Sequence, residues 1–178
     1  MEAEMTSKSE EMQKKAYDLG YKYEGTWGDC SQAAIRSLME VYDEVDKNVF
    51  KGMAGFHGGG GCECDASCGA YCAGMYFISM RYGRELDALG KDPDDPKALE
   101  VLGRLNGLIK KLHEKFIEEY GSIICSQIHR KLYGRTFYFN DPDDVPKFEE
   151  MGGHDWGCTS VVGNAAKWTV EILEAEKV

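Results

Sequence analysis

The stretch that most constrains the fold is residues 55–72, which reads GFHGGGGCECDASCGAYC. Four consecutive glycines there lead into Cys62, Cys64, Cys68 and Cys72. Glycine lets the backbone bend tightly and approach another group closely, because it has no Cβ atom. Cysteine binds soft metals or exchanges disulfides. We therefore interpret these residues as a loop that wraps a bound group or exposes sulfur to one.

Three further cysteines, Cys30, Cys125 and Cys158, lie far from this stretch, and each falls where a helix is predicted to begin. Cys68 shares this feature. Each of the four follows glycine or small polar residues, and small polar residues cap helices. A helix N-terminus gathers free backbone N–H groups and the positive end of the helix dipole, which favour thiolate over thiol.

If the four helix starts converge, they form a pocket for an anionic centre. A cluster ligated by thiolates is anionic, and N–H bonds to its sulfur atoms raise its reduction potential. The same geometry also activates thiols for exchange chemistry. The chain has no Cys-x-x-Cys spacing and no bacterial ferredoxin run, so the fold itself must assemble the site.

Hydrophobic residues recur at helical spacing through most of the chain. We find no convincing strand pattern beyond residues 136–139. Residues 21–28 and 91–96 are interpreted as connections, and residues 135–157 as a long irregular segment. The predicted helices span about residues 7–20, 29–42, 46–53, 65–82, 95–121, 122–134 and 158 onward.

Capping residues predict where several helices begin and end. Ser7 opens a capping box, with a glutamate three residues later, and Gly20 is predicted to end that helix. Asp29 is predicted to cap the next helix, and Asp95 before a proline to cap the clearest one. The helix that contains Cys68 is predicted to be capped by an aspartate or serine shortly before it.

The length and the helical pattern predict an all-α single domain over residues 1–178, a compact bundle of about five to seven helices with the cysteine site at converging helix N-termini. The formal net charge of -10 argues against nucleic acid or an anionic membrane as a partner. No apolar run approaches the ~20 residues that a membrane-spanning helix needs. The polar N-terminus shows no secretory signal, so we expect a cytoplasmic protein, in which clustered cysteines favour metal or redox chemistry over structural disulfides.

The residues around the cysteines resemble the C_GCAxxG_C_C family of redox-active proteins, over residues 29–167. The resemblance lies in DCSQA at residues 29–33, the glycine-rich run followed by CGA at residues 68–70, and Cys125 and Cys158 with their helices. It implies a small helical protein with a redox role, and together with the aromatic content it points to a homodimer. A related module is similar to the iron–sulfur part of split-Soret cytochromes. The family's four cysteines match Cys30, Cys68, Cys125 and Cys158.

The chain departs from this pattern in two ways. The family's Cys-Gly-Ala-x-x-Gly motif ends here in Ala73, with Gly74 one position later. Cys62, Cys64 and Cys72 are extra, and we hypothesise that they ligate a second or larger metal–sulfur centre or line the first. Cys72 can equally be a small hydrophobic residue on its helix.

The histidines give a weaker signal than the cysteines. His57 and His154 lie beside glycines near cysteine segments, so each is a candidate ligand or proton donor, although a solvated loop histidine is the simpler interpretation. His113 and His129 fall on predicted helices, and we interpret them as surface or core-edge residues.

The leading prediction is a redox protein that carries a cysteine-ligated iron–sulfur cluster for electron transfer or redox catalysis. It would exchange electrons with a redox partner protein that the sequence does not identify. The alternatives are a metal-free thiol–disulfide redox protein and a cysteine-rich zinc-binding structural protein. No Ser-His-Asp or paired-carboxylate set has a spacing that requires catalysis, so whether the protein is an enzyme stays open. The predicted cluster ligands are Cys30, Cys68, Cys125 and Cys158, and the candidate metal ligands add Cys62, Cys64 and Cys72.

Overall fold

The chain folds into α-helices joined by short loops, and this computed structural model describes residues 2–88 and 94–177. Within those residues there is no β-strand, as the predicted all-α class requires. An isolated antiparallel bridge pairs Ser67 with Ile124. The strand considered at residues 136–139 is wrong, because residues 136–138 have no regular secondary structure and residue 139 lies in a turn. None of the helices in the described residues is long and apolar enough to cross a membrane.

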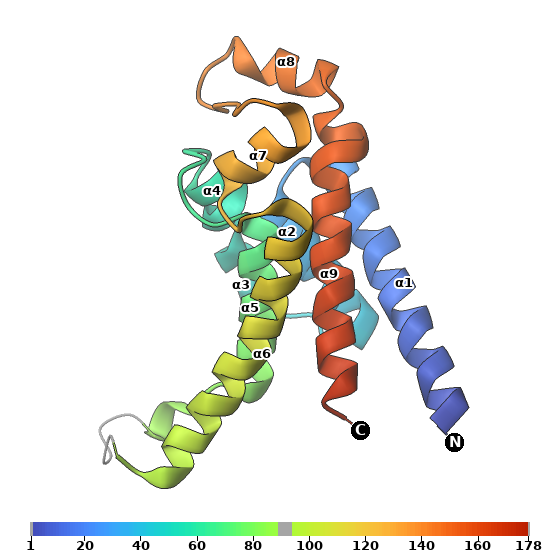
Figure 1. The fold of residues 1–178 in the computed structure, drawn as a ribbon, viewed down its shortest axis with the longest axis vertical. Coiled ribbons are helices and arrows are strands. Elements are labelled where there is room, and N and C mark those ends of the chain that lie inside the picture. Colours follow the sequence, from blue (N-terminus) through green and yellow to red (C-terminus); the bar gives the residue numbers. More distant parts are fainter. Residues whose placement is uncertain (1, 89–93, 178) are drawn as a thin grey trace.

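Helices α1 (Glu2–Trp27) and α9 (Cys158–Ala175) lie side by side and antiparallel, with both chain termini at the same end of the molecule (Figure 1). Glycines allow the two backbones to approach closely. A Cβ added to Gly20 would lie 3.0 Å from the Val162 carbonyl oxygen. The prediction that Gly20 ends a helix is therefore wrong, since α1 continues seven residues further, and the capping box at Ser7 lies inside α1 rather than at its start.

Three more long helices complete the bundle. They are α2 (Cys30–Tyr42), α5 (Gly69–Tyr82) and α6 (Pro96–Tyr120). Helix α2 packs on α1, α5 and α9, and α6 packs on α5 and α9. Gly74 on α5 allows close contact with α9 and α6, because a Cβ there would lie 2.6 Å from Thr169 Oγ1 and 2.8 Å from Leu112 Cδ2.

Two of the predicted caps are present in the structure. Asp29 accepts a hydrogen bond from the backbone N–H of Gln32, and Asp95 accepts one from that of Lys97. The cap predicted for α5 is wrong, because Cys68 itself occupies the N-cap position and makes no side-chain capping bond. Of the predicted connection at residues 91–96, positions 91–93 lie outside the described residues.

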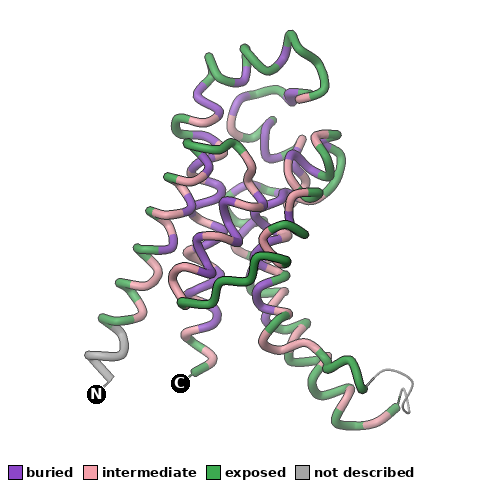
Figure 2. Tube along the Cα trace, turned by 180° about the vertical axis from the view of Figure 1, so that it is seen from behind, coloured by how far each residue is buried: buried purple, intermediate pink, exposed green. Residues whose placement is uncertain are grey.

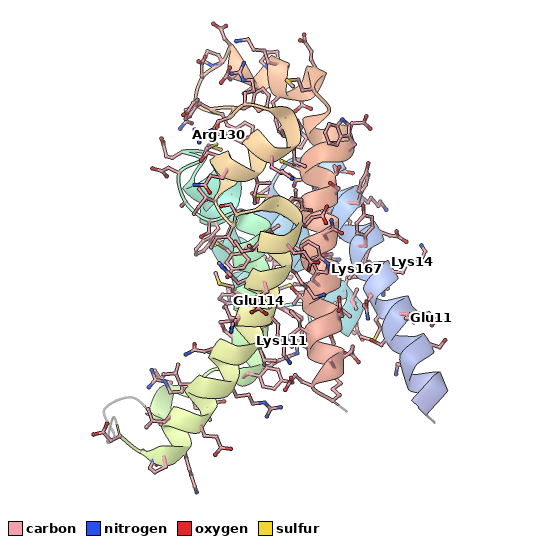
Figure 3. The ribbon with its side chains drawn as sticks, in the orientation of Figure 1. Glu11, Lys14, Lys111, Glu114, Arg130 and Lys167 are labelled. Carbon is pink, nitrogen blue, oxygen red and sulfur yellow. The ribbon has the colours of Figure 1, made fainter. Side chains whose placement is uncertain are left out.

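Buried residues run through the centre of the bundle and into the end opposite the termini, as Figure 2 shows. Charged side chains project outward from the helices, such as Glu11 and Lys14 on α1 and Lys111 and Glu114 on α6 (Figure 3). The N-terminal part of α6 is largely exposed (Figure 2). Of the cysteines, Cys64, Cys68 and Cys125 are buried and the other four are partly buried.

That end is closed by short helices and turns. The predicted irregular segment at residues 135–157 is partly helical, which corrects that prediction. Its turn before α8 is held by Asp144, which contacts Arg135 at 2.6 Å and accepts a bond from the Tyr138 N–H at 3.1 Å. The elements here are α3 (Lys47–Met53), η1 (Ala54–Phe56), α4 (His57–Gly60), α7 (Cys125–Tyr133), α8 (Asp144–Glu150) and the π-helical turn η3 (Gly153–Gly157); η2 (Leu86–Ala88) lies elsewhere, after α5.

Candidate metal centre

Four cysteines stand at the starts of four helices, as predicted from the sequence. Cys30, Cys125 and Cys158 are the first residues of α2, α7 and α9, and Cys68 immediately precedes α5. All four line one cavity of about 270 Å³, to which Cys62 also contributes. The folded chain thus gathers sulfur atoms from segments more than a hundred residues apart in sequence.

The glycine run shapes one wall of this cavity. Residues 58–61 all have positive φ, a backbone conformation that glycine adopts without strain. A Cβ added to Gly59 would lie 2.6 Å from Cys125 Cβ and 2.8 Å from Cys64 Cα. Cys62 and Cys64 also have positive φ, at 73° and 62°. Only glycine at position 59 lets the loop lie this close to the two cysteines.

Backbone hydrogen bonds tie the cysteine loop to the start of α7. The Cys68 N–H donates to Ile123 O at 2.7 Å, and the Cys125 N–H donates to Ala66 O at 3.0 Å. The N–H of the residue after Cys125 donates to Cys64 O at 2.9 Å. These bonds fix the relative positions of Cys64, Cys68 and Cys125 through the backbone.

Cys30 and Cys68 form one hydrogen-bonded pair of sulfur atoms. The pKa of Cys68 is lowered by the hydrogen bond from Cys30, and further by backbone N–H groups of Tyr71 and Ala70 at the start of α5. The pKa of Cys30 is raised by that same bond and by burial. A Cβ on Gly69 would lie 2.7 Å from Cys30 Sγ, so glycine is needed there too. Cys68 is the member of this pair that ionises first.

Cys64 and Cys125 form a second pair. The pKa of Cys64 is lowered by the hydrogen bond from Cys125 and by the backbone of Phe139, whereas that bond and burial raise the pKa of Cys125. Cys64 Sγ also lies 3.1 Å from Phe137 O, to which its thiol donates while it is protonated. The site therefore contains two hydrogen-bonded sulfur pairs, of which only Cys64 does not line the cavity.

His129 lies between the second pair and Cys158. Its Nε2 atom is 3.8 Å from Cys125 Sγ and 3.7 Å from Cys158 Sγ. The ring is 1% exposed and burial lowers its pKa to about 4, so it is neutral at physiological pH. The interpretation of His129 as a surface or core-edge residue is wrong, since it is buried against the sulfur atoms. The ligand atoms of Cys64, Cys125 and His129 lie within 4.8 Å of one another.

Cys158 packs against Tyr133, whose hydroxyl donates to Cys158 Sγ at 3.8 Å. Burial and the nearby Glu24 raise the pKa of Cys158. The preceding Gly157 leaves room for this contact, because a Cβ there would overlap the Tyr133 hydroxyl. The start of α9 is thereby seated on α7.

Glu24 brings a buried carboxylate to the same cavity. It is 3% exposed, and no described residue forms a hydrogen bond with its Oε2 atom. Burial, and then the charge of Cys68, raise the pKa of Glu24 to about 8. His154 Nε2 lies 3.9 Å from Glu24 Oε1, and the other ring nitrogen contacts Glu149 at 2.6 Å. His57 also lines the cavity, with Nδ1 2.5 Å from Ala54 O.

The three extra cysteines occupy different places. Cys62 lines the cavity beside Gly58, and burial raises its pKa. Cys64 is fully buried next to Cys125. Cys72 lies one turn further along α5 and packs against the hydrophobic core instead of lining the cavity; burial raises its pKa to about 11. The backbone N–H of Cys72 donates to Cys68 O at 3.0 Å, but its side chain does not line the cavity.

Sequence reasoning passed over Glu24 and His129. His129 follows Cys125 by four residues on a predicted helix, a spacing that places both side chains on one face, so a signal was available. Glu24 had no such signal, because residues 21–28 were expected to form a connection and α1 in fact extends through them.

Comparison with known proteins gives one match. Residues 29–172 match the family model described as "Putative redox-active protein (C_GCAxxG_C_C)". This match covers well over half of the chain and contains Cys30, Cys68, Cys125 and Cys158. No curated protein and no solved structure matches the chain.

Proposed function

We propose that this chain, which belongs to the C_GCAxxG_C_C family, is a redox protein whose cavity holds an iron–sulfur cluster on Cys30, Cys68, Cys125 and Cys158. The observation that carries the proposal is the meeting of these four cysteines, each at the start of a different helix, around one cavity. When bound, such a cluster accepts and releases single electrons.

The donor set fits a thiolate-ligated cluster. Cys68 accepts hydrogen bonds from two backbone N–H groups at the start of α5, and such bonds stabilise negative charge on sulfur. The four helix N-termini direct the positive ends of their dipoles at the site. The buried Phe148 and the half-buried Phe139 line the cavity with the cysteines and shield the sulfur atoms from water.

Anaerobic purification with iron and sulfide analysis tests this proposal. A brown protein that bleaches with dithionite, with an EPR signal and stoichiometric iron and sulfide, would support it. Single serine substitutions at Cys30, Cys68, Cys125 or Cys158 should lower the iron content, whereas Cys72→Ser should not. A colourless chain that contains zinc, or no metal, after the same purification would refute it.

A metal-free thiol–disulfide cycle is the second candidate, because the structure has two contacting sulfur pairs, Cys30–Cys68 and Cys64–Cys125. Oxidation of one pair would form one S–S bond and give two electrons and two protons to a disulfide-containing partner. Thiol counting and peptide mapping distinguish this candidate. Two disulfides within these pairs, reversible by dithiothreitol in a metal-free chain, would favour it.

Either candidate needs a redox partner protein. We propose that it exchanges electrons at the end of the molecule where α4, α7 and α8 lie (Figure 1), because residues of these helices line the cavity. We also propose that the chain forms a homodimer, and sedimentation equilibrium of the anaerobically purified protein tests this. A single species with the mass of one chain, 19.9 kDa, would exclude the homodimer.

A further inference from the structure

We propose that the protein binds one thiophilic divalent cation, such as Zn²⁺ or Fe²⁺, in a tetrahedral site as an alternative to the cluster. The ligands of this site are Cys64, Cys125, His129 and Cys158. This site goes beyond the proposed cluster, because it recruits a histidine and one of the extra cysteines. Cys125 and Cys158 belong to both ligand sets, so the two states exclude each other in one chain.

The spacing of the donor atoms is close to that of a preformed site. With metal–sulfur and metal–nitrogen bonds of about 2.3 and 2.0–2.1 Å, the S···N edge of a tetrahedron is about 3.6 Å. His129 Nε2 lies 3.8 Å from Cys125 Sγ and 3.7 Å from Cys158 Sγ. The ligand atoms of Cys64, Cys125 and His129 all lie within 4.8 Å of one another. Cys158 Sγ lies outside that group of three, so completing the tetrahedron also requires the Cys158 side chain to move toward Cys64 and Cys125.

Each ligand is held by its own structural element. Cys125 and His129 are four residues apart on α7 and so share one face. Cys64 is fixed by its positive-φ backbone and by the hydrogen bond that its carbonyl accepts from the start of α7. Cys158 begins α9 and is seated against Tyr133. Three of the ligands are therefore already in place, and the Cys158 side chain must move toward them when the cation binds.

The imidazole is oriented for ligation. With the proton on Nδ1, the Nε2 lone pair faces the sulfur atoms. Nδ1 is buried and has no hydrogen-bond partner among the described residues. The ring is instead oriented by Tyr133, Phe137, Phe139 and Phe148, with centroids 5.6–5.9 Å away. An N–H directed at an aromatic face makes a weak hydrogen bond, so packing fixes the ring orientation.

The donor chemistry selects the cation. Three thiolates and one imidazole suit Zn²⁺, Fe²⁺ and Co²⁺, whereas Ca²⁺ and Mg²⁺ require oxygen ligands. Three thiolates with one divalent cation leave a net charge of about -1, which the N-termini of α7 and α9 stabilise. The closed four-ligand set is that of a structural or storage site.

Titration of the reduced, metal-free full chain with Co²⁺ tests this site, because tetrahedral thiolate ligation gives intense visible bands and sulfur-to-cobalt charge transfer. We expect one Co²⁺ per chain, with charge-transfer intensity for three thiolates, and displacement by Zn²⁺. His129→Phe, which preserves the aromatic packing, should weaken Co²⁺ binding at least ~10-fold, since even changes beyond the direct ligands cost that much. Cys64→Ser should weaken it similarly.

Cys72→Ser and His113→Ala, at residues that do not line the cavity, are the matched controls and should bind Co²⁺ as the wild type does. His129→Cys should restore tight binding with a fourth thiolate contribution, and it serves as the test if His129→Phe does not fold by circular dichroism. A folded His129→Phe chain with unchanged Co²⁺ affinity and bands would overturn the proposal, as would His129→Cys with bands identical to the wild type. Iron and sulfide content, measured separately, tests the proposed cluster alone.

Discussion

Replacing Gly59 by alanine should displace two cysteines of the cavity at once. The new Cβ would lie 2.6 Å from Cys125 Cβ and 2.8 Å from Cys64 Cα, distances that real Cβ atoms do not adopt. Gly61 provides a matched control in the same loop. Its φ of 62° is close to the 71° of Gly59, but no atom lies within 4 Å of its added Cβ.

Both substitutions place an L-residue in a left-handed backbone conformation, but only Gly59→Ala also overpacks its surroundings. An L-residue in the left-handed region costs about 1–2 kcal/mol, which applies to both. Overpacking adds about 1–3 kcal/mol, which applies only to Gly59→Ala. We therefore expect the free energy of unfolding to fall by about 1–2 kcal/mol in Gly61→Ala and by about 2–5 kcal/mol in Gly59→Ala. For a chain of this size, each kcal/mol lowers the melting temperature by about 2–4 °C.

Urea denaturation of both variants under anaerobic reducing conditions measures these losses, and metal analysis of the purified proteins measures the effect on the site. Gly59→Ala should also lose bound metal, because it moves Cys64 and Cys125 relative to His129. Gly61→Ala should retain the metal. Equal stability and equal metal content in the two variants would refute the role of close approach at Gly59.

Three further predictions concern buried contacts. Glu24→Gln should stabilise the metal-free protein at pH 9 relative to the wild type. The folded pKa of Glu24, about 8, lies above its ordinary value, so the wild type loses stability as the pH rises from that ordinary value to about 8. The difference in the free energy of unfolding between variant and wild type, measured by urea denaturation, should therefore be larger at pH 9 than at pH 5. Asp144→Asn should destabilise the protein at pH 7, because the Tyr138 N–H and nearby cations lower the folded pKa of Asp144 and so stabilise its charged form. This contribution to stability is lost as the pH falls through the lowered pKa. In denaturation curves, the difference between variant and wild type should therefore close below about pH 3.9. Gly74→Ala should lower the melting temperature, because the added Cβ overpacks the contact between helices. Gly107→Ala, which has no atom near its added Cβ, should instead raise the free energy of unfolding by about 0.5–1 kcal/mol. Equal shifts of the melting temperature in the two variants would contradict the packing argument.

The cysteine positions could be predicted because helix starts are encoded locally. Asp29 caps α2 in the structure, and Gly157 stands directly before α9, so the short-range signals around Cys30 and Cys158 sufficed. The same holds for α6, where the aspartate–proline start and the glycine end are both as expected. Convergence of these starts in space was a hypothesis that local signals alone could not establish.

Glycine was the main source of error in the fold. A glycine that ends a helix and one that admits a neighbouring helix look alike in sequence. Gly20 was interpreted as a stop, yet it lies within α1, where the backbone of α9 at Val162 leaves no space for a Cβ. That single error removed Glu24 from the predicted helix, and with it the carboxylate of the cavity.

The charges around the cavity favour a functional state that includes a cation. Glu24 and Cys158 both have raised pKa values, because burial penalises their charged forms and the nearby acidic groups repel one another. Among the described residues that line the cavity there is no lysine or arginine to offset those charges. A bound metal cation would invert this balance, since it favours thiolate and carboxylate over their protonated forms. Metal binding should therefore release protons without any change of redox state, whereas a dithiol pair releases protons only when it is oxidised to a disulfide. Proton release when Zn²⁺ is added under reducing conditions thus distinguishes the metal centre from the metal-free thiol pair.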